Sequence, residues 1–163
     1  MPDPIQFDIS PTRPDEFGAI LDMTRRVAVF NREEVDTVKE LLDGYAEGPE
    51  ESGYYFLSCR QNDQLLGFAC WGPRALSGCG HDLYWVCADI AVRNTGVGRA
   101  LLRRCEAEAI QRGGLWMVIE TSDTDPYAPA RRLYERSGYK LAMHLPDFYH
   151  QGDGLCTYTR RLQ

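Results

Sequence analysis

The apolar residues along the chain follow two different periods. Apolar positions three or four residues apart are typical of a helix with one buried face, whereas alternating or continuous apolar runs are typical of strands. The first pattern predicts helices over 14–30, 32–45, 98–112 and 128–137. The second predicts strands over 5–9, 54–60, 65–71, 83–92, 115–120, 139–143 and 155–160.

Polar and glycine residues mark several boundaries of these elements. Asn31 followed by Glu34 has the spacing of a capping box, which predicts the start of the second helix. Gly113 and Gly114 predict the end of the third helix, and Gly138 predicts the end of the fourth. Loops or turns are expected at 46–53, 61–64 and 72–80.

The order of these elements favours a single α/β domain. Strands that follow one another predict hairpins, and strand–helix–strand segments predict parallel pairs, so the combination predicts a mixed sheet flanked by helices. We expect about seven strands and about four helices, and a length of 163 residues fits one domain over 1–163.

Composition and charge narrow the classes of partner. The net charge is −6, with −7 in residues 1–80 and +1 in residues 81–163, so we expect no nucleic-acid partner, which would require a basic surface. The chain has no apolar run of roughly 20 residues and no recognisable signal peptide, which favours a cytoplasmic protein without a membrane partner. The six cysteines and three histidines complete no zinc pattern, so we expect free thiols and no metal.

The most informative segment, 91–102, joins a predicted buried strand to an amphipathic helix. Gly96 and Gly98 lack side chains, so the backbone amides around them can approach a ligand closely. These amides and the positive end of the helix can bind an anion, and Arg93 and Arg99 add charge beside them. The pattern indicates a pyrophosphate site. It lacks the P-loop sequence and fits a dinucleotide fingerprint only weakly, and the residues alone also fit a tight turn without a ligand.

Two motifs together resemble those of the GNAT N-acetyltransferase superfamily. Arg93-x-x-Gly96-x-Gly98 is similar to the [QR]-x-x-G-x-[GA] cofactor motif of that family. The segment 130–139 is similar to its second signature, A-R-x-[FL]-Y-x-x-x-G-[FY]. The resemblance covers roughly residues 54–162, and Asn94 departs from it because many members have glycine there.

The resemblance implies a GNAT-like splayed sheet that holds acetyl-CoA as cosubstrate, without a metal. The pantetheine arm is expected to lie between the strand that ends near Ala88 and the strand 115–120, and the pyrophosphate against 93–100. The implied cofactor residues are Val86, Cys87, Ala88, Arg93, Asn94, Thr95, Gly96, Val97, Gly98, Arg99, Ala100, Ser122, Arg131 and Tyr134.

The resemblance also implies an acid and a base for transfer of acetyl to an amine. Asp82, eleven residues before Arg93, is the candidate base because a glutamate holds a similar place in histone acetyltransferases, although the shorter aspartate requires a bridging water. His81 is a second candidate because its ordinary pKa lies near 6.5, and Asp89 suits the role less well. Tyr134 matches the family tyrosine that points at the cofactor sulfur and is the candidate acid. Its helical spacing alone also fits a core tyrosine.

Several questions stay open at the level of sequence. Cys87 lies in a buried apolar strand without a basic neighbour, which argues against a covalent acyl-enzyme. The acceptor is expected to be a small-molecule or peptide amine, and the segment 146–154 is either an acceptor-side loop or a hairpin connection. The sequence is compatible with a homodimer. A non-catalytic acyl-CoA-binding regulatory module is the alternative, since it needs neither Asp82 nor Tyr134.

Overall fold

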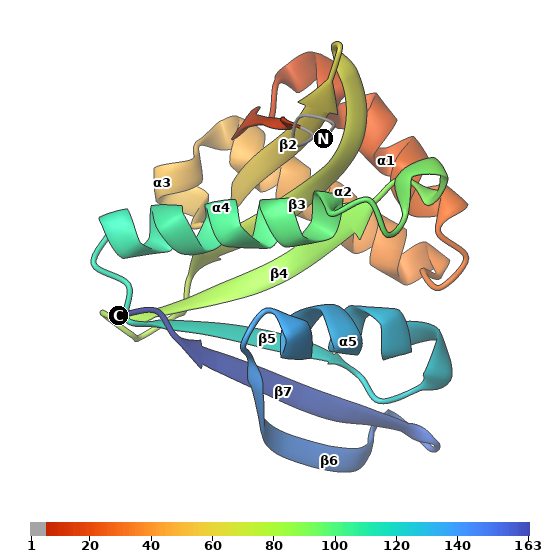
Figure 1. Cartoon of the computed structure of the whole chain (residues 1–163), viewed down its shortest axis with the longest axis vertical. Coiled ribbons are helices and arrows are strands. Elements are labelled where there is room, and N and C mark those ends of the chain that lie inside the picture. The colour runs from red at the N-terminus through yellow and green to blue at the C-terminus, as the bar shows by residue number, and fades with distance from the viewer. Residues whose placement is uncertain (1–5) are drawn as a thin grey trace, which may run out of the picture. The chain divides into compact units, whose positions relative to one another are not determined.

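The computed structural model describes residues 6–163, so the strand predicted at 5–9 lies partly outside the described residues. The chain packs as two compact units. The first contains the described residues up to Cys70 and Trp85–Cys105, and the second contains Trp71–Tyr84 and Glu106–Gln163. Strands β3 (Gln64–Pro73) and β4 (Gly80–Ala88) and helix α4 (Val97–Gln111) each contribute to both units (Figure 1).

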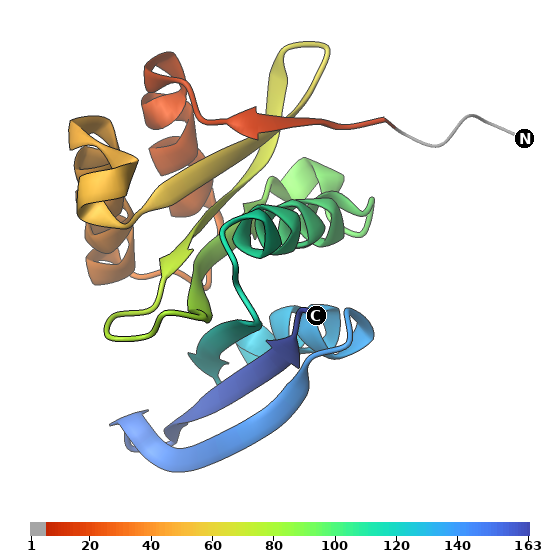
Figure 2. The same cartoon turned by 90° about the vertical axis from the view of Figure 1, so that its left-hand side faces the viewer.

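The first unit has helices on both faces of its strands. Its other elements are β1 (Asp8–Pro11), a 3₁₀ turn (Pro14–Glu16), α1 (Phe17–Arg26), α2 (Arg32–Glu47), α3 (Pro49–Ser52) and β2 (Tyr55–Gln61). Helices α1 and α2 cover one face of β2 and β3, and the first turns of α4 cover the other face (Figures 1 and 2). The strands are ordered β1-β2-β3-β4, with β1 antiparallel to β2.

The core of the first unit explains where α1 ends. Its members come from both helices and from the strands: Ile20, Met23, Val27, Val38, Leu42, Phe56, Phe68, Cys70 and Cys87. Val27 enters this core with an extended backbone, so the α-helix ends at Arg26. The prediction of a helix up to residue 30 is therefore wrong for its last turn, because burial of Val27 outweighs the helical period.

Local capping determines the start of α2. The Asn31 side chain accepts a hydrogen bond from the Glu34 amide at 2.9 Å, and the Glu34 carboxylate accepts one from the Asn31 amide at 2.7 Å. The predicted capping box is confirmed. The predicted loop at 46–53 is wrong, because α2 continues to Glu47 and Pro49 opens the single turn α3, a position that proline favours.

The strand before the candidate phosphate site is shorter than predicted. The β2–β3 connection lies at the expected place, with left-handed backbone at Asn62 and Asp63 as in a type I′ hairpin. Strand β4 was predicted over 83–92, and it spans Gly80–Ala88. The prediction is wrong at its end because the Asp89 side chain accepts a hydrogen bond from the Ala91 amide at 2.9 Å and caps a 3₁₀ turn.

The second unit places α5 (Ala128–Arg136) over the strands β5 (Trp116–Ser122), β7 (Asp153–Arg161) and β6 (Lys140–His150) (Figure 2). Strand β5 is parallel to β4, with Gly80 opposite Trp116, and antiparallel to β7. The short 3₁₀ turn Asp125–Tyr127 precedes α5. The described strands form a seven-stranded mixed sheet ordered β1-β2-β3-β4-β5-β7-β6, and the predicted mixed α/β fold is confirmed.

Strand β6 is much longer than the predicted 139–143. It reaches His150, so the segment 146–154 is the end of this strand and a turn into β7 rather than a separate loop. All eleven residues of β6 are exposed, and two register shifts interrupt its pairing with β7. Pro146 fits here because β6 is an edge strand, where a missing N–H costs little. Among residues 6–163, no helix has the length and apolar character that crossing a membrane requires.

Candidate functional site

The turn between β4 and α4 contains the first predicted motif. Asn94 and Gly96 both have positive φ, 63° and 96°. The Thr95 hydroxyl donates to the Val92 carbonyl at 2.6 Å, and the Ala100 amide donates to the Gly96 carbonyl at 2.9 Å as α4 begins. The chain therefore reverses within a few residues and presents the start of a helix at the end of a strand.

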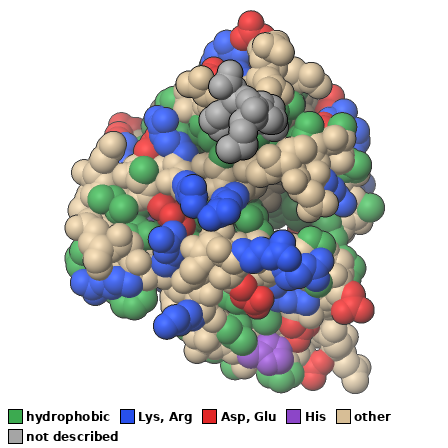
Figure 3. All heavy atoms as spheres, viewed as in Figure 1, with side chains coloured by type: hydrophobic (Ala, Val, Ile, Leu, Met, Phe, Trp, Pro, Cys, Tyr) green, Lys and Arg blue, Asp and Glu red, His purple; other side chains and the backbone are tan. Residues whose placement is uncertain are grey.

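The surface at this turn suits an anionic ligand. A Cβ atom at Gly96 would meet no heavy atom within 4 Å, so space is open beside its backbone. The first four N–H groups of a helix have no partner within the helix, and they carry the positive end of its dipole. Arg93 and Arg99 are exposed beside them, and Figure 3 shows basic side chains gathered along α4. The residues present fit a pyrophosphate.

Gly67 on β3 allows α4 to approach the strands closely. A Cβ atom there would lie 2.7 Å from the Cys87 carbonyl oxygen and 2.8 Å from a methyl carbon of Val97. Val97 itself is 1% exposed and fixes the first turn of α4 in the core. Sequence reasoning missed Gly67, although a glycine in the middle of an apolar strand is a known signal of close approach.

An ion pair holds the end of β4 in place. The Arg26 guanidinium, at the end of α1, donates to the Asp89 carboxylate at 2.6 Å, and the Asp89 amide donates to the Leu66 carbonyl at 2.8 Å. Asp89 is thus used twice, as a cap and as an ion-pair partner. This favours a structural role for it, and Arg26 is a second residue that the sequence did not indicate.

The residues predicted for the pantetheine arm precede this turn on β4. Val86 and Ala88 are half-buried, whereas Cys87 is buried. Burial raises the pKa of the Cys87 thiol to about 12, so this thiol stays protonated at neutral pH. The expectation that Cys87 is no nucleophile agrees with this environment. The first unit thus brings together Val86, Cys87, Ala88, Arg93, Asn94, Thr95, Gly96, Val97, Gly98, Arg99 and Ala100.

The candidate base, Asp82, lies on β4 in the second unit. Its Oδ1 atom accepts a hydrogen bond of 2.5 Å from Nη1 of Arg74, and its side chain is 14% exposed. Burial raises the pKa of Asp82, and the Arg74 guanidinium opposes this rise without cancelling it. A carboxylate with a raised pKa is a stronger base than an ordinary aspartate.

His81, the alternative base, is packed in the interior of the second unit. It is 4% exposed, its ring centroid lies 5.8 Å from that of Trp71, and its Nδ1 atom has no hydrogen-bond partner among the described residues. Burial and then the Arg112 guanidinium lower the pKa of His81, so the imidazole is neutral at neutral pH. Its burial favours a packing role over proton transfer with an acceptor.

The candidate acid, Tyr134, is a buried residue of α5. Its ring centroid lies 5.9 Å from that of Tyr158 and 6.3 Å from that of Tyr139, and the residue is 6% exposed. Burial raises the pKa of Tyr134 well above its ordinary value. The phenol therefore stays protonated in the neutral range, which is the state that a proton donor needs.

Ser122 and Arg131 support the loop that joins β5 to α5. Nη1 of Arg131 donates to the carbonyl oxygens of Ser122 and Thr124 at 2.7 and 2.8 Å. The Ser122 hydroxyl donates to the Asp153 carboxylate at 2.6 Å and lies 2.8 Å from the Thr124 hydroxyl. The second unit thus contains Asp82, Ser122, Arg131 and Tyr134.

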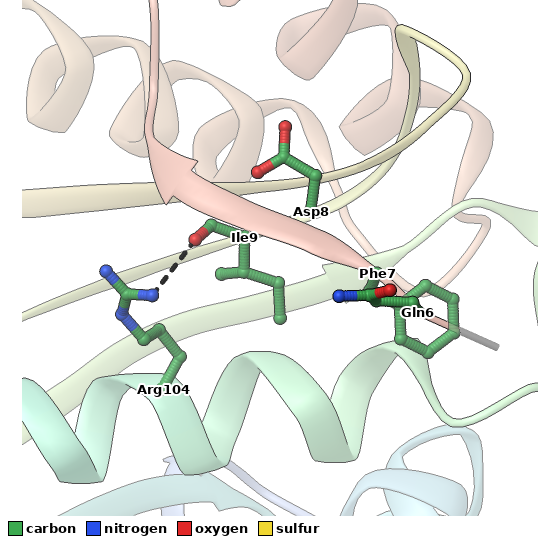
Figure 4. A pocket seen from close by; sticks show the side chains of 5 residues that line it. All are labelled: Gln6, Phe7, Asp8, Ile9 and Arg104. Atoms are coloured by element: carbon green, nitrogen blue, oxygen red, sulfur yellow. Dashed lines mark hydrogen bonds between the residues drawn. The ribbon is translucent and has the colours of Figure 1, made fainter. Parts of the chain in front are cut away.

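A separate hollow of about 550 Å³ lies between β1 and α4 in the first unit (Figure 4). Its lining residues are Gln6, Phe7, Asp8, Ile9 and Arg104, and Nη1 of Arg104 donates to the Ile9 carbonyl at 3.1 Å. None of the predicted site residues lines it, so the hollow is not the predicted cofactor site.

Comparison with known proteins places the chain in a family. The model of the acetyltransferase (GNAT) family matches residues 19–139. A GNAT-family protein from Desulfovibrio desulfuricans has a crystal structure that matches with a TM-score of 0.92 and 30% identity, over 97% of this chain and 100% of that one. The fold also matches an aminoglycoside 6'-N-acetyltransferase complexed with coenzyme A, with a TM-score of 0.77 and 18% identity, over 96% of this chain and 97% of that one.

Another relative matches over a shorter part of the chain. Blasticidin-S acetyltransferase from Streptomyces morookaense is 40% identical over 68 residues, which are 41% of this chain and 46% of that protein. The match thus spans less than half of that relative's length. The chain belongs to the GNAT acetyltransferase family. The predicted family and fold class are confirmed, and membership supports the predicted enzyme class and its acetyl-CoA cosubstrate.

Proposed function

We propose that the chain is an N-acetyltransferase that transfers the acetyl group of acetyl-CoA to a primary amine by direct attack in a ternary complex, with residues 1–163 acting as one catalytic domain. The β4–α4 turn carries this proposal. It combines open space beside Gly96, the first amides of α4 and two exposed arginines, Arg93 and Arg99, in a chain of the GNAT family.

Residues of this turn would hold the cosubstrate. The amides from Gly96 to Arg99 are the proposed donors to the pyrophosphate, and Arg93 and Arg99 would screen its charge. Val86, Cys87 and Ala88 would offer the backbone of β4 to the pantetheine arm. Ser122, at the end of β5, and Arg131, on α5, would support the cosubstrate. Acetyl-CoA supplies an activated thioester, and the protein supplies the proton transfers.

Asp82 and Tyr134 are the proposed proton-transfer residues. Asp82 takes a proton from the acceptor ammonium, directly or through a water, and leaves a neutral amine. As the amine nitrogen bonds to the thioester carbon and the carbon–sulfur bond breaks, the sulfur gains the electron pair and the Tyr134 hydroxyl donates its proton to it. The nitrogen then loses its second proton to the Tyr134 phenolate, which becomes a phenol again. Asp82 releases the first proton to solvent.

The acceptor is proposed to be an amine of a small molecule or a peptide. Among similar proteins, one is an aminoglycoside acetyltransferase and another is named blasticidin-S acetyltransferase, which supports a small-molecule amine as acceptor. The acidic balance of residues 1–80 also suits a cation.

An amine-panel assay tests this function. Purified protein is mixed with acetyl-CoA and with single amines from each acceptor class, and release of free CoA is followed. Turnover of any amine supports the enzyme. Binding of CoA without turnover of any amine supports the non-catalytic module instead.

A further inference from the structure

We propose that Arg74 is a positioning residue for acetyl transfer, which holds the Asp82 carboxylate ionised and directs one of its oxygens to the acceptor. This inference rests on the proposed function, in which Asp82 is the base. The geometry of the turn that follows β3 carries it.

The turn fixes the backbone of Arg74 through hydrogen bonds of both its amide and its carbonyl. The Arg74 amide donates to the Gly80 carbonyl at 2.9 Å, and the Ser77 amide donates to the Arg74 carbonyl at 3.1 Å. The Ser77 hydroxyl accepts from the Gly80 amide at 2.8 Å, which closes the turn on itself. The backbone of Arg74 therefore has a defined place next to the start of β4.

The guanidinium of Arg74 lies against two carboxylates on neighbouring parallel strands. Nη1 is 2.5 Å from Oδ1 of Asp82 on β4, and Nη2 is 3.8 Å from Oε1 of Glu120 on β5. A planar guanidinium that contacts two carboxylates is held in a defined orientation. Glu120 thus acts as the second anchor of the arginine.

The contact with Asp82 uses one carboxylate oxygen only. Among residues 6–163, Arg74 is the hydrogen-bond partner of Asp82, and the bond involves Oδ1. The second oxygen, Oδ2, is left for an ammonium or a water. Since 14% of the Asp82 side chain is exposed, a proton can reach it.

The charges that face Asp82 explain why it needs this partner. Arg74 comes from the turn after β3 and His81 from β4 itself, and both lower the pKa of Asp82. Glu120 on β5 and Tyr84 on β4 act on Arg74 instead. Burial raises the pKa of Asp82, and Arg74 is the largest influence that lowers it. Without Arg74, burial would leave the carboxyl protonated over more of the pH range, and a protonated carboxyl cannot act as a base.

Stability alone does not account for this arrangement. Arg74 and Glu120 have side chains that are 45% and 46% exposed, and exposed ion pairs add little to folding stability because water screens them. A residue that acted only on stability would change the rate equally at every pH. A positioning residue changes the pH at which the rate falls.

The test compares Arg74→Met, which removes the charge, with Arg74→Lys, which keeps it. Arg25→Met is the matched control, because Arg25 is an exposed arginine paired with Asp22 on α1. The kcat/KM of the best amine from the panel is measured between about pH 5.5 and about pH 9, together with the Kd for CoA. An opposite charge at this distance lowers the pKa of an aspartate by about one unit or more. In Arg74→Met, the acid limb of the kcat/KM profile should therefore move up by about one pH unit.

The other expected results follow from the same role. The rate of Arg74→Met should approach that of the wild type near the alkaline end, the Kd for CoA should not change, and Arg74→Lys should restore most of the profile. In an Asp82→Asn background, Arg74→Met should lower the rate by less than about twofold, since it acts through Asp82. An equal loss at every pH, or a Lys variant as impaired as the Met variant, would overturn the proposal.

A measurement without turnover tests the role of Arg74 separately from the proposed function. Carbon-13 NMR of the aspartate carboxyls, with Asp82→Asn to assign the signal, gives the pKa of Asp82 in wild type and in Arg74→Met. We expect the pKa to rise in the variant, and an unchanged pKa contradicts the role of Arg74 whatever the assay gives. If the pKa rises but no amine is acetylated by the wild type, the proposed function fails and the catalytic role of Arg74 fails with it.

Discussion

Tyr134 shows how one hydroxyl can be tested without disturbing its surroundings. Its ring packs against Tyr139 and Tyr158, and phenylalanine keeps those contacts. If the hydroxyl protonates the leaving thiolate, Tyr134→Phe should lower kcat by roughly 10²-fold and leave the affinity for acetyl-CoA nearly unchanged. Steady-state kinetics with isothermal titration of CoA measures both. An unchanged kcat would return Tyr134 to a purely packing role.

The lowered pKa of His81 predicts how folding stability depends on pH. Its pKa in the folded protein lies below the ordinary value near 6.5, so the unfolded chain binds protons more readily. The free energy of unfolding should therefore be fully present above about pH 6.5 and fall as the pH decreases below it. Urea unfolding at several pH values, in wild type and His81→Gln, measures this.

The exposed His150 provides the control for that measurement. His150→Gln removes an exposed imidazole and is measured beside His81→Gln, which should lose part of the wild-type slope, whatever its stability at neutral pH. Equal slopes in the wild type and His81→Gln would mean that other groups cause the acid sensitivity.

The site residues differ in how far the sequence could indicate them. Asp82 and Tyr134 were proposed because they stand at fixed distances from recognisable motifs. Arg26 could not be found this way, because its partner Asp89 lies 63 positions further along the chain. Arg74 is only eight positions from Asp82, yet no local pattern indicates that the turn after β3 brings the two together.

At the scale of elements, the contact of β3 with β4 and α4 leaves no room for a side chain at Gly67. Gly67→Ala places a methyl group 2.7 Å from the Cys87 carbonyl and 2.8 Å from Val97. We expect a loss of about 1–3 kcal/mol in the free energy of unfolding, because the backbone must shift to relieve the overlap. We also expect weaker binding of CoA, since α4 carries the amides of the candidate phosphate site. Urea unfolding and CoA titration measure the two effects.

Gly18→Ala is the control for this substitution. Gly18 is exposed on α1, and a Cβ atom there meets nothing within 4 Å. Alanine should stabilise the helix by up to about 1 kcal/mol and leave CoA binding unchanged. The packing argument would fail if Gly67→Ala were as stable as wild type.

Elements defined by local chemistry were predicted best. The capping box of Asn31 and Glu34 involves neighbours in sequence, so α2 began where expected. The end of α1 depends on the burial of Val27 in a core that the local sequence does not contain. The length of β6 was missed because the alternation of Leu141, Met143 and Leu145 stops at Pro146, where a register shift also interrupts the pairing with β7.

At the scale of the whole molecule, binding of the cosubstrate should stabilise the native state. Acetyl-CoA at about one hundred times its Kd should add about 2.7 kcal/mol to the free energy of unfolding and raise the Tm, and NAD should not. Gly98→Glu should abolish the shift, since it places a negative charge where the pyrophosphate is proposed to bind. Differential scanning fluorimetry with each ligand measures this.

Gly18→Glu adds the same charge at an exposed position of α1 and should keep the wild-type response to acetyl-CoA. A folded Gly98→Glu variant that still responds to acetyl-CoA would show that the phosphate site lies elsewhere. A shift with NAD and none with acetyl-CoA would contradict the cosubstrate.

The edge strand β6 also affects how the protein behaves at high concentration. It exposes Leu141, Met143, Leu145, Phe148 and Tyr149, and strands of this kind can recruit copies of themselves into growing aggregates. Such growth needs an unbroken row of backbone donors and acceptors. Pro146 removes one donor and the two register shifts interrupt the row, so the strand keeps its apolar side chains without offering a continuous template. Replacing Pro146 should therefore lower the colloidal stability of concentrated samples before it lowers the folding stability.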